Sequence, residues 1–378
     1  MKKLFSVLLA ACILAALPAC TPYKELKELS IVEGMALDKM DGGVRLTFQI
    51  YDPQGGSGGG QSGQSTSNET IIESSGKTIY DAMRNATLSI GKKMYFPNTR
   101  IIIVSEAFCK EDFASTIDML NRAIEIRPSV KILVSKGTAA EILTAKKDGK
   151  LIAAKDFETV MESYSVSSKV VPFTLEDLIN KESDGITDIA LAAVETQKDE
   201  GGNDVLVADG TAILRKGRFV SYMDTTETRG MLWALGKVKS GIIVVSPSYG
   251  GKLSMEITSS SSKISSKMKG DEPSIEIDVS FTTNVDELGT SSVILTNGAQ
   301  VNELALLQDN AVKQEISSAI NTSMRMDDAD IYGFGMKFFE NQPEAWKKIS
   351  TKWAMIIKTI PVTIHVTSNI AHTGMITQ

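Results

Sequence analysis

Three cysteines are the most reactive side chains in this sequence, and the residues around Cys20 suggest its chemistry. The chain begins MKKLFSVLLAACILAALPAC, with Lys2 and Lys3 before an apolar run over residues 4–17. A cationic start, an apolar run and small residues at its end are typical of a secretory signal peptide. The Leu-Pro-Ala-Cys ending matches a bacterial lipobox. We therefore expect cleavage after residue 19 and a diacylglyceryl group on the Cys20 thiol.

An uncleaved membrane anchor is the alternative interpretation of the same segment. Its apolar run of about 14 residues is shorter than the roughly 20 that cross a bilayer core. Lipid chains on Cys20 hold a protein on a membrane without spanning it. The sequence thus predicts a signal peptide over residues 1–19 and a water-soluble body tethered outside the cytoplasm.

The remaining reactive side chains do not form a catalytic or metal-binding pattern. His365 lies on the polar face of a predicted strand and His372 near the end of the chain, and spacing supplies neither with a partner. The acidic group at residues 327–330 lacks the glycine and the terminal glutamate of a calcium loop and is interpreted as a helix cap. Cys109 has no second cysteine to pair with and is expected to be a buried, neutral thiol. We predict no catalytic residue, no metal and no cofactor.

The most informative polar segment is DTTETRGMLW, residues 224–233. On a helix, Glu227 and Arg229 lie on different faces. Gly230 in the helix interior lowers helix stability by about 1 kcal/mol relative to alanine, and its presence there indicates that a neighbouring backbone comes close. Arg229 either pairs with a carboxylate inside the domain, with Trp233 in the core, or contacts a partner. Trp346 and Trp353 are seven residues apart on one predicted helix face, where core packing and a partner-facing stripe are both open.

Composition indicates an ordinary globular chain of two or three domains. The 378 residues are 42% hydrophobic and 23% charged, and the net charge is −6 without long runs of one sign. This acidic balance argues against nucleic acid and against direct adhesion to anionic headgroups.

Hydrophobic periodicity predicts α/β layers in the first half of the chain. A hairpin over 30–51, a helix from Thr78, and strands at 100–105 and 130–134 separated by a helix indicate a sheet layered with helices. The polar turn at 198–203 suggests a boundary near residue 200, and a further division near residue 150 stays open.

The second half predicts an antiparallel sheet packed on long helices. Strands are expected at 205–214, 218–222, 242–246, 253–257, 275–281 and 362–367, with helices at 225–235, 301–324 and 346–356. The predicted fold class is therefore multidomain α+β, with a region over 20–200 and a second over 201–378.

Several segments resemble the spore germination receptor C-subunit lipoproteins, the Ger(x)C family. They are LKELSIVEGMALDK (26–39), SEAF and LNRAIEIRPSVKILVSKGTAAEIL within 105–143, GTAILRKGRFVSYMDTTETRGMLWALGKVKSG (210–241) and DADIYGFGMKFFENQPEAWKKISTKW (328–353). Departures are Ser105, where the family usually has glycine, Thr21-Pro22 after the cysteine, and the long Gly-rich loop at 54–68. Candidate partner or structural contacts in the matching segments are Glu106, Arg122, Arg127, Glu227, Arg229, Gly230, Trp233 and Trp346.

The resemblance implies a non-enzymatic subunit of a nutrient germinant receptor, held by its lipid on the outer face of the inner spore membrane. Its implied partners are two integral membrane subunits. A substrate-binding lipoprotein of a transporter is the alternative, and it needs a deep cleft between two similar α/β lobes. An envelope hydrolase would need a nucleophile and a base, which the sequence does not suggest.

Overall fold

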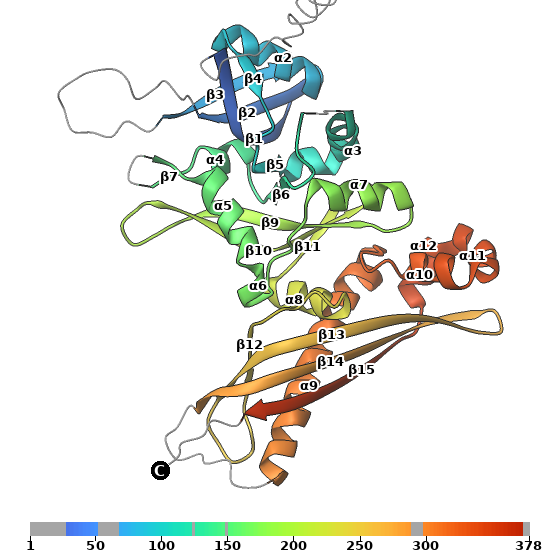
Figure 1. Cartoon of the computed structure of the whole chain (residues 1–378). Coiled ribbons are helices and arrows are strands. Elements are labelled where there is room, and N and C mark those ends of the chain that lie inside the picture. The colour runs from blue at the N-terminus through green and yellow to red at the C-terminus, as the bar shows by residue number, and fades with distance from the viewer. Residues whose placement is uncertain (1–27, 52–67, 123–124, 148–149, 289–297, 373–378) are drawn as a thin grey trace, which may run out of the picture.

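The computed structural model describes residues 28–51, 68–122, 125–147, 150–288 and 298–372. These residues form two large β-sheets that follow one another along an elongated molecule, each with its own helices (Figure 1). The predicted multidomain α+β class is confirmed. The predicted signal peptide, Cys20 and residues 54–67 of the Gly-rich segment lie outside the described residues.

The N-terminal sheet has the strand order β11-β10-β9-β6-β5-β1-β2-β3, and β4 pairs with β1. Its central strands β9, β6, β5 and β1 run parallel, whereas the outer pairs are antiparallel. The strands are β1 Leu29–Met40, β2 Gly43–Tyr51, β3 Glu69–Gly76, β4 Lys93–Tyr95, β5 Ile101–Ser105, β6 Lys131–Ser135, β9 Ile189–Lys198, β10 Asp204–Arg215 and β11 Arg218–Met223. Two short strands, β7 Lys146–Lys147 and β8 Lys150–Leu151, form a separate ribbon.

Helices cover both faces of this sheet, as the continuously apolar strand β5 requires. Ile102 and Val104 pack with Phe113, whereas Ile101 and Ile103 pack in the opposite core with Phe157. The helices on the first side are α2 Ile79–Ile90, α3 Glu106–Arg122 and α7 Leu175–Asp184, and those on the second are α4 Ala139–Leu143 and α5 Ala153–Glu162, followed by α6 Tyr164–Ser167. The α/β layering predicted for this half is therefore present.

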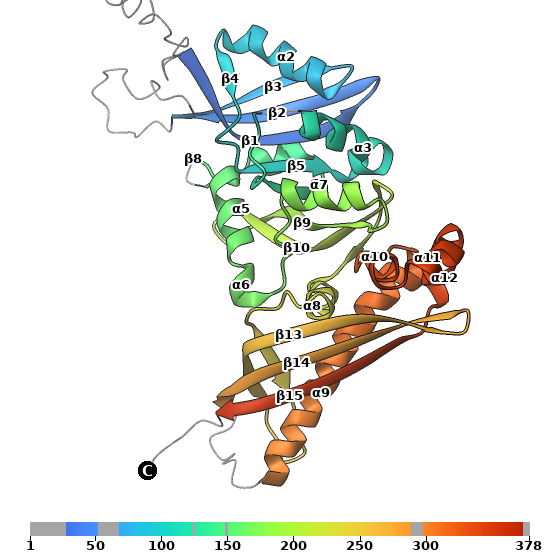
Figure 2. The ribbon, with the colours of Figure 1, turned by 45° about the vertical axis from the view of Figure 1, so that its right-hand side comes forward.

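The polar turn predicted at 198–203 joins β9 and β10 within one sheet. The N-terminal sheet thus continues past residue 200 to Met223, and α8 (Thr225–Ala234) follows it toward the second sheet (Figure 2). The boundary near residue 200 stays a prediction, because a turn within a sheet does not by itself separate two folding units.

The C-terminal sheet has the order β12-β13-β14-β15, and only part of it is antiparallel. Its strands are β12 Ile242–Val245, β13 Leu253–Lys269, β14 Glu272–Leu288 and β15 Val362–His372. The expectation of a purely antiparallel sheet is wrong for β15, which runs parallel to β14. The connection between them contains several helices, and such a crossover returns the chain in the same direction.

The helices of the C-terminal half are more broken than the periodicity predicts. Regular α-helix α9 (Gly298–Ile320) continues as a π-helical segment, η2 (Asn321–Met326). After α10 (Phe334–Asn341), the expected helix at 346–356 is divided into α11 (Pro343–Ile349), the 3₁₀ turn η3 (Ser350–Lys352) and α12 (Trp353–Thr359). Ser350 and Thr351 favour helix weakly, which accounts for a break at this position.

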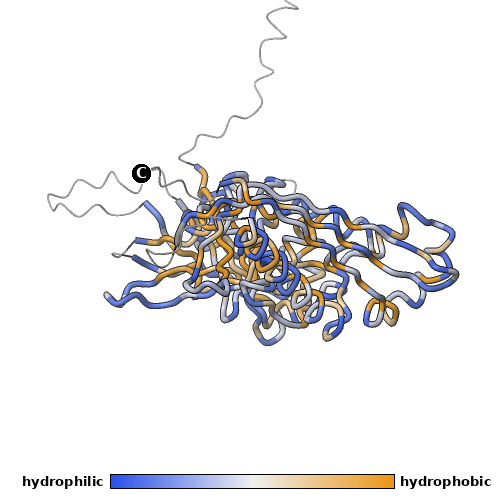
Figure 3. The backbone as a smooth tube through the Cα atoms, turned by 90° about the horizontal axis from the view of Figure 1, so that it is seen from below, coloured by the Kyte–Doolittle hydropathy of each residue, from blue (hydrophilic) through white to orange (hydrophobic). Residues whose placement is uncertain are grey.

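Apolar segments gather inside the molecule, and hydrophilic turns lie at its periphery (Figure 3). One core cluster runs from Leu37 and Phe48 in the N-terminal sheet through Trp233 to Phe281 in the C-terminal sheet. None of the described helices combines the length and the apolar character needed to span a bilayer. The two halves are also dissimilar, so the paired lobes required by the transporter alternative are not present among the described residues.

Candidate functional site

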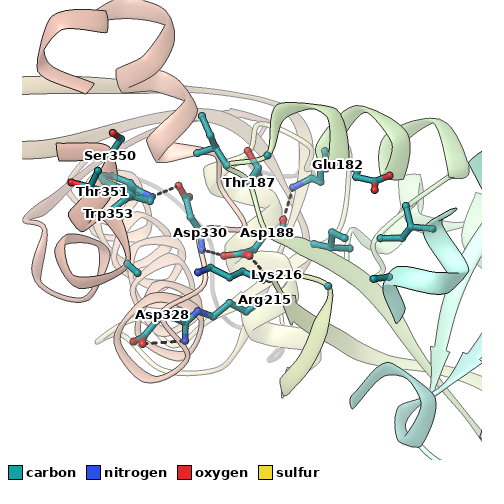
Figure 4. Close-up of a pocket in the computed structure, with 18 of the residues that line it drawn as sticks. Glu182, Thr187, Asp188, Arg215, Lys216, Asp328, Asp330, Ser350, Thr351 and Trp353 are labelled. Atoms are coloured by element: carbon teal, nitrogen blue, oxygen red, sulfur yellow. Dashed lines mark hydrogen bonds and ion pairs between the residues drawn. The ribbon is translucent and has the colours of Figure 1, made fainter. Parts of the chain in front are cut away.

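A cavity of about 530 Å³ lies where the N-terminal sheet meets the C-terminal helices (Figure 4). Its walls come from α3, the end of α7, the β10–β11 turn, the segment before α10, and α11 to α12. Charged side chains from both halves line it, so it is the place where the two parts of the chain are joined by polar contacts. We call the residues around it the junction: Lys181, Asp188, Arg215, Asp328, Asp330, Trp346 and Trp353.

Asp330 is the most buried charged residue of the junction, at 2% exposure. Its carboxylate accepts hydrogen bonds from the backbone N–H groups of Phe334 (2.9 Å) and Gly335 (2.7 Å) at the start of α10. The indole Nε1 of Trp353 donates a third, at 3.2 Å. Burial nevertheless raises the pKa of Asp330 to about 6. The helix cap expected for this acidic group is therefore Asp330.

Asp188 lies directly before β9 and receives hydrogen bonds from two other segments. Its carboxylate accepts from the backbone N–H of Lys216 at 2.9 Å and of Asp330 at 2.8 Å. Burial raises the pKa of Asp188, and these hydrogen bonds oppose the shift. The side chain thus joins the β10–β11 turn to the segment before α10.

The cations of the junction are held by backbone carbonyls and by a shared carboxylate. Lys181 Nζ donates to the carbonyl oxygens of Asp188 (3.1 Å) and Ile331 (3.3 Å), and burial lowers the pKa of Lys181 to about 8. Asp328 binds Arg215 at 3.3 Å and Lys358 at 2.6 Å. These groups are engaged in contacts that hold the two halves together.

Trp346 and Trp353 form the aromatic wall of the junction despite the break in their helix. Their ring centroids are 5.4 Å apart in an edge-on arrangement. A Cβ on Gly335 would lie 2.9 Å from Trp353 Nε1 and 3.0 Å from the Trp346 ring, so only glycine fits there without displacement. The YGFG segment therefore brings α10 against both indoles.

Helix α8 connects the two sheets and carries the next group of predicted residues. Arg229 Nε donates to Glu315 Oε2 at 2.9 Å, a second bond joins Arg229 Nη2 to Glu315 Oε1, and Trp233 Nε1 donates to Glu315 at 3.2 Å. A Cβ on Gly230 would lie 2.0 Å from the carbonyl oxygen of Glu315. The close backbone at Gly230 is that of α9.

Glu227 contacts the end of α9 and its π-helical extension. Its carboxylate accepts from Thr322 Oγ1 at 2.6 Å and Ser318 Oγ at 3.0 Å, and closes a capping box with Asp224. Arg229 and Glu227 leave different faces of α8, as predicted, yet both contact the same long helical segment. The candidate residues of α8 are thus brought together through α9.

The three candidates around α3 lie apart from this group. Glu106 accepts a hydrogen bond from Tyr222 at 2.8 Å, which ties α3 to β11. Arg122 is exposed and pairs with Asp118 at 2.8 Å on the same helix. Arg127 is exposed in the segment before β6. Their role as partner contacts stays a prediction.

Two other residues that the sequence singles out lie outside the junction. Cys109 is fully buried, and burial raises the pKa of its thiol. His365 lies 3.3 Å from Glu276, with Asp278 close by, a neighbourhood that the sequence spacing did not supply. Lys267 also pairs with Glu276, so this group is an exposed charge cluster on the sheet face.

Sequence reasoning did not single out Lys181, Asp188, Arg215 or Glu315 as functional candidates. A sequence feature could have identified Glu315, because it is an acidic residue within the apolar stripe of α9, between Val312 and Ile316. Asp188 had no such feature, since its partners are distant in sequence.

Comparison with known proteins gives consistent matches along the whole chain. A family model described as "Spore germination protein N-terminal domain" matches residues 22–196, and one described as "Spore germination B3/ GerAC like, C-terminal" matches residues 209–374. Spore germination protein KC of Bacillus subtilis is 23% identical over 99% of this chain and 96% of its own.

Further relatives and a solved structure agree. Spore germination protein B3 of Bacillus subtilis is 19% identical over 93% of this chain and 91% of its own. The crystal structure of the GerBC protein superposes with a TM-score of 0.58 at 18% identity, covering 92% of this chain and all of that one. At 18% identity, this likeness shows a similar fold only.

Proposed function

This chain belongs to the GerAC-like family of spore germination proteins, and from that membership we propose that it is the lipid-anchored C subunit of a germinant receptor. In this proposal it acts without catalysis, by contact with two integral membrane subunits, on the extracytoplasmic face of the inner spore membrane. The observation that carries the proposal is that the two family models together span almost the whole mature chain.

Anchoring is assigned to Cys20 because of the lipobox that precedes it. Two acyl chains of a diacylglyceryl group bury enough CH₂ groups, at about 0.8 kcal/mol each, to hold a protein on a bilayer. This chemistry and the family membership support the proposed membrane location.

Action by contact is supported by the way the polar groups of the junction are used. The carboxylates of Asp188 and Asp330 accept hydrogen bonds from backbone N–H groups, and Lys181 donates hydrogen bonds to backbone carbonyls. Such groups hold segments in place. We assign Arg229, Gly230 and Trp233, which are buried, to positioning α8 on α9, and the exposed Arg122 and Arg127 to contact with partners.

Co-purification from spore membranes tests the proposal. A tagged chain is expected to bring down two polytopic membrane proteins. Recovery of the chain alone under conditions that preserve membrane complexes would contradict the proposed partnership. Turnover of a metabolite by the purified chain would contradict the absence of catalysis.

The anchor has its own test. The Cys20→Ala variant is expected to leave the membrane fraction and to impair germination, because it removes the acylated thiol. Cys12→Ala is the matched control, since it changes a thiol within the predicted signal peptide and leaves Cys20 intact. Equal membrane retention of both variants would overturn the assignment to Cys20.

A further inference from the structure

The position of the first described strand places one end of the molecule near the proposed anchor. Eight residues lie between Cys20 and Leu29, so nine Cα–Cα steps, at most about 32 Å of extended chain, join the lipid to β1. Leu29 pairs with Lys93 of β4, and β4 directly follows the end of α2. Helix α2 thus lies at the anchored end, whereas α9 lies at the other end of the molecule (Figure 2).

Helix α2 exposes side chains that suit a membrane interface. Tyr80, Arg84 and Leu88 follow at intervals of four residues and so share one face. Tyr80 is 52% exposed and Leu88 is 84% exposed. The Arg84 guanidinium lies 5.3 Å from the centre of the Tyr80 ring. Tyrosine rings and the stems of arginines sit readily at the level of lipid headgroups.

Two hollows lie between α2 and α3 on either side of Tyr80. The larger, of about 820 Å³, is lined by apolar residues such as Met40, Ile79 and Phe108 and by charged ones such as Lys39, Glu111 and Asp118. The smaller, of about 240 Å³, is lined by Met83, Met94 and Phe96. Both include Tyr80 and Arg122. The face of α2 therefore borders two hollows that are lined by both apolar and charged side chains.

Some cations around this face form ion pairs with carboxylates, and others do not. Lys39 pairs with Glu111, Lys93 with Glu125, and Arg122 with Asp118. In contrast, the described residues provide no carboxylate partner for the side chains of Lys77 and Arg84, which flank Tyr80. The nearby carboxylate of Asp81 accepts the backbone N–H of Lys77. The chain is acidic overall, but this face carries two cations whose side chains form no ion pair within the described residues.

We infer that the face of α2 formed by Lys77, Tyr80, Arg84 and Leu88 rests on the bilayer that holds the anchor. Lys77 and Arg84 meet anionic headgroups, and Tyr80 and Leu88 enter the interface. This inference rests on the anchoring proposed above. It departs from the expectation, drawn from net charge, that the chain does not adhere to anionic headgroups. The elongated body then places its C-terminal sheet away from the membrane.

A fluorescent label at Leu88 tests the contact. The mature lipidated chain with Leu88→Cys is labelled with NBD and reconstituted in vesicles of phosphatidylglycerol and phosphatidylethanolamine that carry a doxyl quencher on the acyl chains. Cys109 is fully buried, so the introduced thiol takes the label. Leu306→Cys is the matched control, because Leu306 is also a helical leucine, 65% exposed, on the distant α9.

The inference predicts blue-shifted, quenched emission at position 88 and emission typical of water at position 306. The double variant Lys77→Gln/Arg84→Gln is expected to lower the membrane-inserted fraction at position 88 by about tenfold, because each cation contributes to attraction by an anionic surface. Lys313→Gln/Arg218→Gln removes two distant cations and is expected to have no effect.

The possible outcomes distinguish a wrong membrane contact of α2 from a wrong anchor. If the chain floats with the vesicles but the label at position 88 behaves as at position 306, the contact is wrong and the anchor stands. If the chain does not float with the vesicles, the anchor is wrong and this inference falls with it.

Discussion

Asp188 and Asp330 exchange two hydrogen bonds although 142 residues separate them in sequence. The backbone N–H of Asp188 donates to the Asp330 carbonyl oxygen at 2.9 Å, and the backbone N–H of Asp330 donates to Asp188 Oδ2 at 2.8 Å. Because the first residue precedes β9 and the second precedes α10, this pair joins the N-terminal sheet to the C-terminal helices.

Replacing Asp188 with asparagine is expected to weaken this connection. The amide keeps the shape of the side chain but turns one acceptor oxygen into an NH₂ group, which then faces a backbone N–H. A buried donor left without an acceptor costs about 1–3 kcal/mol, so the free energy of unfolding should fall by that amount. Urea unfolding followed by circular dichroism measures it.

Asp41→Asn is the control for this substitution, since Asp41 is exposed in the β1–β2 turn and should change stability little. Equal stability of the Asp188→Asn chain and the wild type would show that the replaced acceptor oxygen of Asp188 contributes nothing to folding.

The pKa of Asp330 predicts a specific pH dependence. Its folded-state pKa, about 6, lies above the ordinary value of 3.8, so its favourable contribution is complete below about pH 4 and is lost as the pH rises through 6. A shift of this size corresponds to roughly 3 kcal/mol. The stability of the wild type relative to Asp330→Asn, which cannot ionise, should therefore fall between pH 4 and pH 7.

Denaturant unfolding of both chains at several pH values measures this difference. The pKa of Asp188 is also raised, so its contribution to stability changes with pH in the same direction. The pKa of Lys181 is lowered to about 8, so its contribution is lost only as the pH falls through 8. A difference between the two chains that stays constant from pH 4 to pH 7 would contradict a raised pKa at Asp330.

Local sequence patterns predicted the elements better than their arrangement. The hairpin of β1 and β2, the buried strand β5 and the helix start at Thr78 follow from period-two alternation, a continuous apolar run and side-chain capping chemistry. The parallel return of β15 depends on a crossover of several helices. Periodicity within a strand carries no information about direction.

The junction and the contact between α8 and α9 could be predicted only in part, for a similar reason. Gly230 indicated a close backbone and Trp353 an apolar helix face, because each deviates from what an exposed helix would carry. Asp188 resembles any polar residue before a strand, and its function depends on Lys216 and Asp330, which only the folded chain brings to it.

Gly230→Ala is expected to force α8 away from α9. The new Cβ would lie 2.0 Å from the Glu315 carbonyl oxygen, which is backbone and cannot rotate away. Overpacking of this kind costs about 3 kcal/mol. Thermal unfolding of the variant should show a clearly lower midpoint than the wild type.

Gly298→Ala is the matched control, since Gly298 also belongs to a helix and its Cβ would meet no atom of the described residues within 4 Å. That substitution should leave stability unchanged or raise it by up to about 1 kcal/mol, because alanine favours helix. Equal effects of the two substitutions would mean that helix propensity, and not the contact with α9, governs Gly230.

Arg229 and Glu315 are expected to behave as a coupled buried pair. Arg229→Met leaves the Glu315 carboxylate without its cation inside the protein, which should cost about 3–5 kcal/mol. The double variant Arg229→Met/Glu315→Leu should recover part of this loss, since apolar residues can replace a buried ion pair. A double-mutant cycle from urea unfolding measures the coupling, and additive losses would argue against it.

Arg127 offers a test of partner contact that is separate from folding. Its side chain is exposed before β6, so Arg127→Glu should leave the unfolding midpoint unchanged. If the residue meets a membrane subunit, charge reversal should reduce the amount of that subunit recovered with the tagged chain and slow germination, because like charges at an interface repel. Arg218→Glu, an exposed arginine on the edge strand β11, is the matched control and should retain normal recovery. Normal recovery with both variants would remove Arg127 from the proposed contact surface, whereas equal loss with both would indicate a general effect of net charge.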